Sequence, residues 1–406
     1  MKRDERLPPL LAAFLGAESD AADAPRTGGA RFLRFPGTGG GWVLLDAANP
    51  AVFRAGTALL PRGRFVTRLA TRVVGASARV GLHGRFARAR VAAARVVDPA
   101  ERFPGLPRGL ACNAASGVPG RDQKTIVQLV SPNGRVVAFA KVADSLAARA
   151  LVRREHDALA QLAHHGVHVP RVLGFEDAER ATVLVQSALQ GERAPAAFGA
   201  AHAAFLAELT ERTRVEFSAT DLPAHRSAHA RLAALASVPA RPGVSATAPL
   251  DRAALETYAE LARVLEEHER GDRVACSFAH GDFTPWNAVL GPDGLGAFDW
   301  EHALDAAPLG HDALHFVLQH AILVERVPHA ALAAHARARL APYAARLFPA
   351  GFERALAHWT LDLGLRDELR EREHPSPFVQ AGWQRSARLE LAAHAVRRLA
   401  RKEHAA

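Results

Sequence analysis

The stretch "AHGDFTPWNAVL", residues 279–290, decides the fold because it places three polar side chains in an apolar setting. His280, Asp282 and Asn287 lie between the runs "ACSF" and "VLGPDGLGAFDW", and Asp299 follows twelve residues after Asn287. Short apolar runs bounded by glycine, proline and asparagine are typical of buried strands joined by tight loops. We therefore expect a rigid loop system that carries two carboxylates and an amide.

These residue types suit phosphoryl transfer. That reaction needs Mg²⁺ held against the phosphates, a cation on the phosphate oxygens and an acceptor hydroxyl aimed in line. Mg²⁺ prefers oxygen ligands and usually takes one or two carboxylates. We expect Asn287 and Asp299 to bind Mg²⁺, Asp282 to accept the proton of the substrate hydroxyl, and His280 to brace the loop through a backbone hydrogen bond.

The motif "HGDFTPWN" followed by "FDWEHA" resembles the catalytic loop and metal-binding segment of the aminoglycoside phosphotransferase and choline kinase family. The family pattern is H-G-D-x-x-x-x-N, an apolar strand pair, and then I/F-D-W/F-E, and every defining position is filled here. The resemblance covers residues 110–320, about half of the chain. It implies an α+β, two-lobed protein-kinase-like fold, with a small β-rich N-lobe and a helical C-lobe.

A kinase also needs a lysine for the α- and β-phosphates. The strand-like run "VVAFAKVAD" offers Lys141, and Glu155 lies fourteen residues later in a helical pattern, which echoes the strand lysine and helix glutamate of kinases. A chance surface pair is the alternative. The loop that covers the phosphates would be "ASGVPGRDQKT" (115–125) with Gly117 and Gly120, which is poorer in glycine than expected.

The nucleotide is expected to be ATP or GTP, with Mg²⁺ as cofactor. The segment that corresponds to the kinase hinge is "VQSALQG", where Gln186 stands at the usual acidic position. Adenine would be held there by backbone groups, so this segment does not distinguish the two nucleotides.

The chain divides by pattern into three parts: a basic, partly β N-terminal α/β domain of unknown role (1–105), a kinase-like N-lobe (106–190) and a helical C-lobe with the catalytic loop and acceptor pocket (191–406). The boundary follows from the proline- and glycine-rich run "DPAERFPGLPRG". We expect two strands around a glycine turn in "ARFLRFPGTGGGWVLLD", a hairpin around Asn133-Gly134, a hairpin-like pair in 169–189, and helices at 145–165, 196–216, 225–237, 249–269 and from 311 onward.

The basic charge is confined to the N-terminal quarter. Residues 1–110 hold 18 Lys and Arg against 8 Asp and Glu, whereas the remainder holds 33 against 34. Such a surplus suggests an anionic partner or a membrane surface, and Arg64, Arg68 and Arg72 would form one cationic stripe on a helix. The alternatives are a compositional bias, since the chain has 47 Arg and only 4 Lys, and an ordinary packed surface helix. Strong indications of nucleic-acid binding are lacking.

Several function classes lack support. The sequence has no run of 18 apolar residues, which argues against a membrane span, and no Walker A motif or GxSxG elbow, so P-loop and hydrolase functions lack support. Its two cysteines, Cys112 and Cys276, are far apart and form no CxxC motif, so a reducing cytoplasm is expected. The run "HDALH" (311–315) imitates a zinc motif without its glutamate. The resemblance instead implies that Asp312 braces the catalytic loop, and we expect His315 and His320 to be ordinary core or surface histidines.

These observations predict a small-molecule kinase that transfers the γ-phosphoryl group of ATP or GTP to a hydroxyl of an amino alcohol, a sugar or glycan intermediate, or an aminoglycoside. Residues 299–406 hold 13 acidic and 14 basic residues, which is not the acidic bias that a polycationic antibiotic favours. The alternative is a catalytically weak, nucleotide-binding regulatory protein recruited through its basic N-terminal domain. Presence of the whole set of Lys141, Asp282, Asn287 and Asp299 favours the enzyme.

Overall fold

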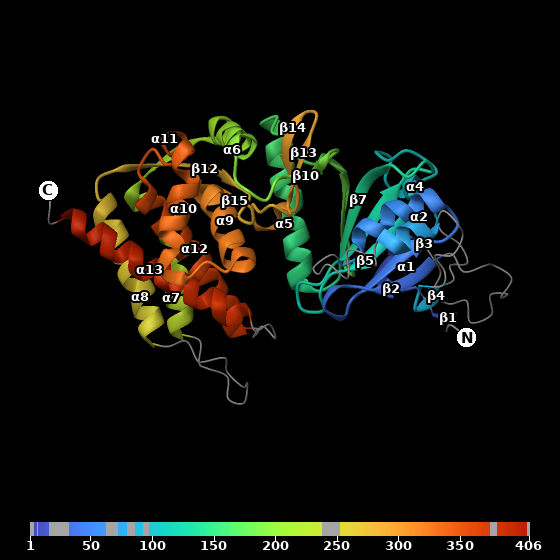
Figure 1. The fold of residues 1–406 in the computed structure, drawn as a ribbon, viewed down its shortest axis with the longest axis horizontal. Coiled ribbons are helices and arrows are strands. Elements are labelled where there is room, and N and C mark those ends of the chain that lie inside the picture. The colour runs from blue at the N-terminus through green and yellow to red at the C-terminus, as the bar shows by residue number, and fades with distance from the viewer. Residues whose placement is uncertain are drawn as a thin grey trace. The chain divides into compact units, whose positions relative to one another are not determined.

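The computed structural model describes residues 4–5, 7–15, 32–61, 72–78, 86–91, 97–237, 252–373 and 380–403. The chain forms two compact units, the first from residues 1–164 and 170–189, the second from residues 165–169 and 190–406 (Figure 1). No helix within the described ranges is long and apolar enough to cross a membrane.

The first unit is built on one nine-stranded sheet. Its strands and helices are β1 (Asp4–Glu5), α1 (Pro9–Phe14), β2 (Phe32–Pro36), β3 (Trp42–Asp46), α2 (Pro50–Gly56), β4 (Ala89–Val91), α4 (Pro99–Arg102), β5 (Ala111–Ser116), β6 (Thr125–Val130), β7 (Val136–Ala143), α5 (Leu146–His164), β8 (Val172–Asp177) and β9 (Thr182–Ser187). The strand order is β1-β4-β2-β3-β5-β6-β7-β9-β8, and every pair is antiparallel except β1 with β4.

Alternate residues of the strands bury two separate clusters. Phe32 and Leu44 belong to a cluster that includes Phe14 of α1, whereas Leu33 and Leu45 belong to a cluster that includes residues of α2. Successive side chains of a strand point to opposite faces of the sheet. Helices α1 and α2 therefore supply apolar side chains to opposite faces of the sheet.

The sheet runs without a break across the boundary that we placed at residue 105. Strand β3 pairs with β5 at Val43 with Ala115 and Leu44 with Ala114. The side chain of Asn113 donates to the carbonyl of Val52 at 2.9 Å, and its Oδ1 accepts from the backbone N–H of Asp46 at 2.9 Å. The N-terminal segment thus shares one sheet with the strands of the expected N-lobe, and its separation as a domain stays a prediction.

The second unit is mainly helical, with two three-stranded sheets. Its elements are β10 (Glu192–Arg193), α6 (Ala200–Thr213), β11 (Val215–Ser218), α7 (Pro223–Ser237), α8 (Arg252–Glu269), β12 (Arg273–Ala279), β13 (Ala288–Gly291), β14 (Gly294–Ala297), β15 (Leu304–Pro308), α9 (His311–His320), a π-helical turn (Ala321–Glu325), α10 (Leu332–Leu340), α11 (Ala344–Leu347), α12 (Phe352–Glu373) and α13 (Gln380–Glu403). The sheet orders are β10-β13-β14 and β11-β12-β15.

Four of these helices pack side by side around an apolar core: α7, α8, α12 and α13 (Figure 1). Leu261 and Leu265 of α8 are fully buried there with Leu365 of α12 and Ala392 of α13. The spacing of four residues between Leu261 and Leu265 puts both on one face of the helix. This core supports the elements that carry the polar loop.

The expected elements within the described residues are confirmed, except that the helix expected at 196–216 spans only Ala200–Thr213 and is followed by the strand Val215–Ser218. The hairpins are β2–β3, β6–β7 and β8–β9, and "PGTGGGW" forms the turn of the first of them. Arg64 and Arg68 lie outside the described residues, so the cationic stripe stays a prediction, as does an anionic partner for the N-terminal segment.

Candidate active site

The loop that carries His280, Gly281 and Asp282 follows β12, and α9 holds it through hydrogen bonds. Both carboxylate oxygens of Asp312, in the first turn of α9, accept backbone N–H groups of the loop, from His280 at 2.7 Å and from Gly281 at 3.0 Å. Asp312 is buried, and these bonds hold its pKa below the usual value with help from His311, although burial opposes ionisation. The expected bracing role of Asp312 is therefore borne out by the geometry.

His280 braces the same loop from within. Its Nε2 donates to the carbonyl of Phe298 at 2.8 Å, while its Nδ1 accepts the backbone N–H of Asp282 at 3.2 Å. The ring is fully buried, and its centroid lies 4.6 Å from that of Trp300. His280 thus braces the loop through a backbone hydrogen bond, as the sequence predicted, and the carbonyl that it binds belongs to the residue before Asp299.

Gly281 is required by the close approach of two backbone segments. Its φ of 74° lies in the left-handed region, and a Cβ placed on it would stand 2.0 Å from the carbonyl oxygen of His302. No side chain fits there without moving the backbone. This glycine lets the loop pass His302 and present the next residue, Asp282.

The Asp282 carboxylate is held by one donor on each oxygen. The amide nitrogen of Asn287 lies 2.9 Å from Oδ2, and Nε2 of His315 lies 3.0 Å from Oδ1. Burial opposes ionisation of Asp282, but the hydrogen bond from His315 and the nearby His280 and His302 hold its pKa below the usual value. Its side chain is 31% exposed, so an ionised and oriented carboxylate remains accessible.

The two predicted metal ligands, Asn287 and Asp299, lie on either side of the β13–β14 hairpin in the sequence. Ala288 pairs with Ala297, and the backbone N–H of Phe298 donates to the carbonyl of Asn287 at 3.0 Å, so the residues on either side of the hairpin meet at its open end. Asp299 has a φ of 73°, one of two non-glycine residues of the described chain with positive φ. Such strain concentrates at functional sites.

This donor set fits Mg²⁺. The amide nitrogen of Asn287 donates to Asp282, at its backbone carbonyl and at Oδ2, so the Asn287 side chain keeps its oxygen as the group for a cation. Asp299 supplies a carboxylate. A carboxylate and an amide oxygen are hard ligands of the kind that Mg²⁺ prefers.

Lys141 and Glu155, in the first unit, form a buried ion pair. Nζ of Lys141 on β7 lies 2.5 Å from Oε2 of Glu155 on α5, and the two side chains are 7% and 0% exposed. The alternative of a chance surface pair is therefore wrong. Lys141 pairs with Ile126 near the start of β6, which places it at the end of the sheet where the β5–β6 turn lies.

The β5–β6 turn contains Gly117 and Gly120. Gly117 closes the turn by donating to the carbonyl of Lys124 at 2.8 Å, and Gly120 is exposed. A Cβ at Gly120 would meet nothing within 4 Å. Packing does not require these glycines, so their role at a phosphate stays a prediction. Gln186 lies buried on β9.

His315 was expected to be an ordinary core or surface histidine, and it is a core residue, but the sequence did not predict its place beside Asp282. It is buried, but its ring contacts Asp282 directly. Trp359 of α12 donates to its Nδ1 at 3.4 Å, and Arg366 of the same helix donates to the carbonyl of Gly281 at 3.3 Å. The one signal in the sequence was the spacing of Asp312 and His315, three residues apart and therefore on one face of a helix.

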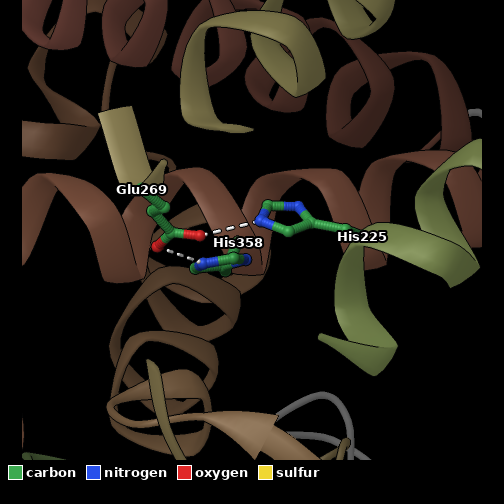
Figure 2. A group of neighbouring side chains, drawn as sticks. All are labelled: His225, Glu269 and His358. Carbon is green, nitrogen blue, oxygen red and sulfur yellow. Dashed lines mark hydrogen bonds and ion pairs between the residues drawn. The ribbon is translucent and has the colours of Figure 1, made fainter. Parts of the chain in front are cut away.

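A second cluster of polar side chains lies elsewhere in the helical unit. Figure 2 shows His225 of α7 and His358 of α12 converging on Glu269, the last residue of α8, with Nε2–carboxylate distances of 2.8 and 2.9 Å. Two imidazoles and a carboxylate could hold a metal ion. However, Arg354 places Nε 3.1 Å and Nη2 3.0 Å from Oε1 of Glu269, so a cation already occupies this carboxylate.

Solved structures similar to this chain include three phosphotransferases. An aminoglycoside phosphotransferase, APH(3'')-Id from Streptomyces rimosus, in complex with ADP and streptomycin, is 18% identical over 59% of this chain and 89% of its own, with a TM-score of 0.41. A mutant of APH(4)-Ia with AMP-PNP and hygromycin B is 15% identical over 73% and 96%, with a TM-score of 0.49. The amicoumacin kinase hAmiN is 13% identical over 67% and 86%, with a TM-score of 0.41. Similarity this low carries no activity to the present chain.

No curated protein matches the sequence. The model of the phosphotransferase enzyme family, by contrast, matches residues 119–350, which is more than half of the chain. This range includes the buried Lys141–Glu155 pair as well as the loop with Asp282 and Asn287 and the Asp299 segment. The chain therefore belongs to the phosphotransferase enzyme family, and its α+β fold, a β-sheet unit and a helical unit, is the one that the motif predicted.

Proposed function

We propose that this protein is a kinase that transfers the γ-phosphoryl group of ATP or GTP to the hydroxyl of a small molecule. The observation that carries this proposal is the Asp282 carboxylate, which is held by one donor on each oxygen and is still 31% exposed. Enzymes that transfer phosphoryl groups need little more from the protein at the acceptor than such an oriented base.

Asp282 accepts the proton of the acceptor hydroxyl. Asn287 and His315 each occupy one lone pair, so the carboxylate keeps lone pairs that can accept from a hydroxyl, and its side chain is 31% exposed. A carboxylate fixed in this way aims the hydroxyl oxygen at the phosphorus, and proton transfer in the transition state is worth about 10²–10⁴-fold in rate.

Asn287 and Asp299 are the residues that would hold Mg²⁺ in the second unit. When bound, Mg²⁺ neutralises charge that develops on the phosphate oxygens. The chain's contribution is to fix the two oxygen ligands at the open end of the β13–β14 hairpin, with the Asn287 amide oriented by its bonds to Asp282.

In the first unit we assign Lys141 to the phosphates of the nucleotide, with Glu155 orienting its ammonium group. Gly117 and Gly120 of the β5–β6 turn offer backbone that a phosphate can approach closely. The acceptor is an amino alcohol, a sugar or glycan intermediate, or an aminoglycoside. The balanced charge of residues 299–406 is less suited to a polycation than to the other two classes.

The test is Mg²⁺-dependent release of ADP or GDP over a panel of acceptors, with identification of the phosphorylated product. The panel includes choline, simple sugars, streptomycin and hygromycin B. We expect turnover with one class, and a higher Mg²⁺ requirement for Asp299→Asn than for wild type. Tight nucleotide binding without turnover on any acceptor would instead support a regulatory protein.

A further inference from the structure

We propose that His315 is a positioning residue for Asp282, which it holds in a single orientation by donating its Nε2–H to Oδ1. This inference rests on the proposed role of Asp282 as the base. His315 itself would touch neither nucleotide nor acceptor. Its effect would reach the reaction only through the direction in which the carboxylate points.

The contact is short and fully enclosed. Nε2 of His315 lies 3.0 Å from Oδ1 of Asp282, and the His315 side chain is 1% exposed. Asn287 binds the other oxygen at 2.9 Å, so the two donors approach the carboxylate on different oxygens. A carboxylate held at both oxygens cannot rotate about χ2 without breaking one of these bonds.

The other side of the ring determines which nitrogen carries the proton. The indole Nε1–H of Trp359 points to Nδ1 of His315 at 3.4 Å, and an indole nitrogen is a donor only. Nδ1 is therefore the acceptor, and the ring hydrogen is on Nε2, where Asp282 receives it. Burial lowers the pKa of His315, in the direction of this neutral form, although the bond to Asp282 opposes the shift.

In this tautomer His315 can position Asp282 but cannot relay a proton away from it. Nε2 already carries a hydrogen, so it cannot take up the proton that Asp282 receives from the acceptor. Nδ1 faces the Trp359 N–H in the interior and offers that proton no exit. The ring thus serves as a fixed donor, and any side chain that presents an N–H at the same place can replace it.

Glutamine meets this condition, because its Nε2 lies about as far along the side chain as the Nε2 of histidine. We expect His315→Leu to lower kcat by about 10- to 100-fold, the cost of a misaimed carboxylate, with the KM for nucleotide unchanged. His315→Gln should recover most of the loss. The control is His320→Gln on the same helix, whose ring contacts Glu325 at 3.1 Å and not the loop, and it should behave as wild type.

The assay uses Mg²⁺ and ATP or GTP with the best acceptor of the panel, and it includes Asp282→Asn. Full activity of the Asp282→Asn variant would contradict the proposed function itself. Loss of activity in Asp282→Asn together with wild-type kcat in His315→Leu would overturn the positioning role alone. Equal losses in His315→Leu and His315→Gln would also overturn it, because a donor at that place would then not matter.

A second measurement does not depend on activity or on the folding of the leucine variant. The ¹⁵N chemical shifts of the His315 ring, assigned by their absence from His315→Gln, report the tautomer in the wild-type protein. The proposal predicts an Nε2–H ring at neutral pH. An Nδ1–H ring would overturn it.

Discussion

Asp282 and Glu269 are two carboxylates of the same helical unit, and histidine binds each of them. They differ in how far their side chains are exposed to solvent. Glu269 is bound by His225, His358 and Arg354 and is 1% exposed, whereas Asp282 is 31% exposed. Burial would raise the pKa of both groups, but their partners hold each pKa below its usual value. Ionisation alone therefore does not distinguish the carboxylate that we propose as the base from one that holds helices together.

The difference lies in the partners. Glu269 joins three helices, because its donors come from α7 and α12 while it ends α8. Asp282 is bound by the amide of one loop residue, Asn287, and by the ring of one helix residue, His315, whose pKa burial lowers toward the neutral form. An accessible carboxylate can still accept a proton from a bound molecule, whereas Glu269 is enclosed by its three partners and holds helices together.

The comparison predicts the largest loss of stability for Glu269→Ala. Removing one partner of a buried ion pair leaves His225, His358 and Arg354 without their carboxylate and costs about 3–5 kcal/mol in the free energy of unfolding. Asp282→Asn should cost about 1 kcal/mol, because the amide oxygen can still accept from His315. Urea unfolding of both variants measures the difference, and equal losses would show that the two carboxylates do not differ in structural role.

The free energy of unfolding should also depend on pH through His311, which contacts the Asp312 carboxylate that holds the loop. Burial lowers the pKa of His311, but its contacts with Asp312 and Asp362 outweigh this and raise the pKa to about 9. Because the pKa of His311 is higher in the folded protein than its value of 6.5 in the unfolded chain, protonation of His311 stabilises the fold. This contribution to the free energy of unfolding is fully present below pH 6.5 and is lost as the pH rises through about 9. We expect a loss on the order of 3 kcal/mol between these limits.

The measurement is the free energy of unfolding at pH 6 and at pH 10, for wild type and for His311→Gln. The variant should show little of this change on the alkaline side, since it cannot titrate at that position. The same slope in both proteins would contradict the assignment of the alkaline loss to His311.

The smallest expected effect compares two glycines, one beside each carboxylate. Gly281 and Gly271 have φ values of 74° and 84°, but a Cβ would meet the His302 carbonyl at 2.0 Å in the first and nothing within 4 Å in the second. Alanine should therefore cost about 1–2 kcal/mol at Gly271, for its left-handed backbone alone. At Gly281 the clash adds to that cost and displaces the loop, so kcat should fall only there. Unchanged kcat in Gly281→Ala would show that the loop tolerates displacement.

Local patterns in the sequence predicted most of the secondary structure. Asn133 and Gly134 specify the β6–β7 hairpin because the turn chemistry is local, and the long apolar periodicity of α5 and α8 predicts helices in the same way. The motif "HGDFTPWN" was equally local, since Asp282 and Asn287 lie on one loop. The positions of Lys141 and Glu155 could be predicted from the demands of phosphate binding.

Contacts between distant segments could be predicted only where the family resemblance implied them, as for Asp312 and the loop at His280. The pairing of β3 with β5, which merges the N-terminal segment with the rest of the sheet, joins residues about seventy positions apart. The Glu269 cluster joins residues separated by 44 and 89 positions, and the contact of His315 with Asp282 spans 33. Such contacts depend on how helices pack, and a single sequence holds no signal for that.

The central claim is that Asp282, and not merely a folded nucleotide-binding chain, is needed for phosphoryl transfer. A single-turnover experiment follows the labelled γ-phosphoryl group of ATP or GTP, with Mg²⁺, to the best acceptor of the panel in wild type and in Asp282→Asn. The account predicts transfer by wild type, and transfer by Asp282→Asn that is slower by about 10²-fold or more with unchanged nucleotide affinity. Transfer at equal rates by both proteins would contradict it.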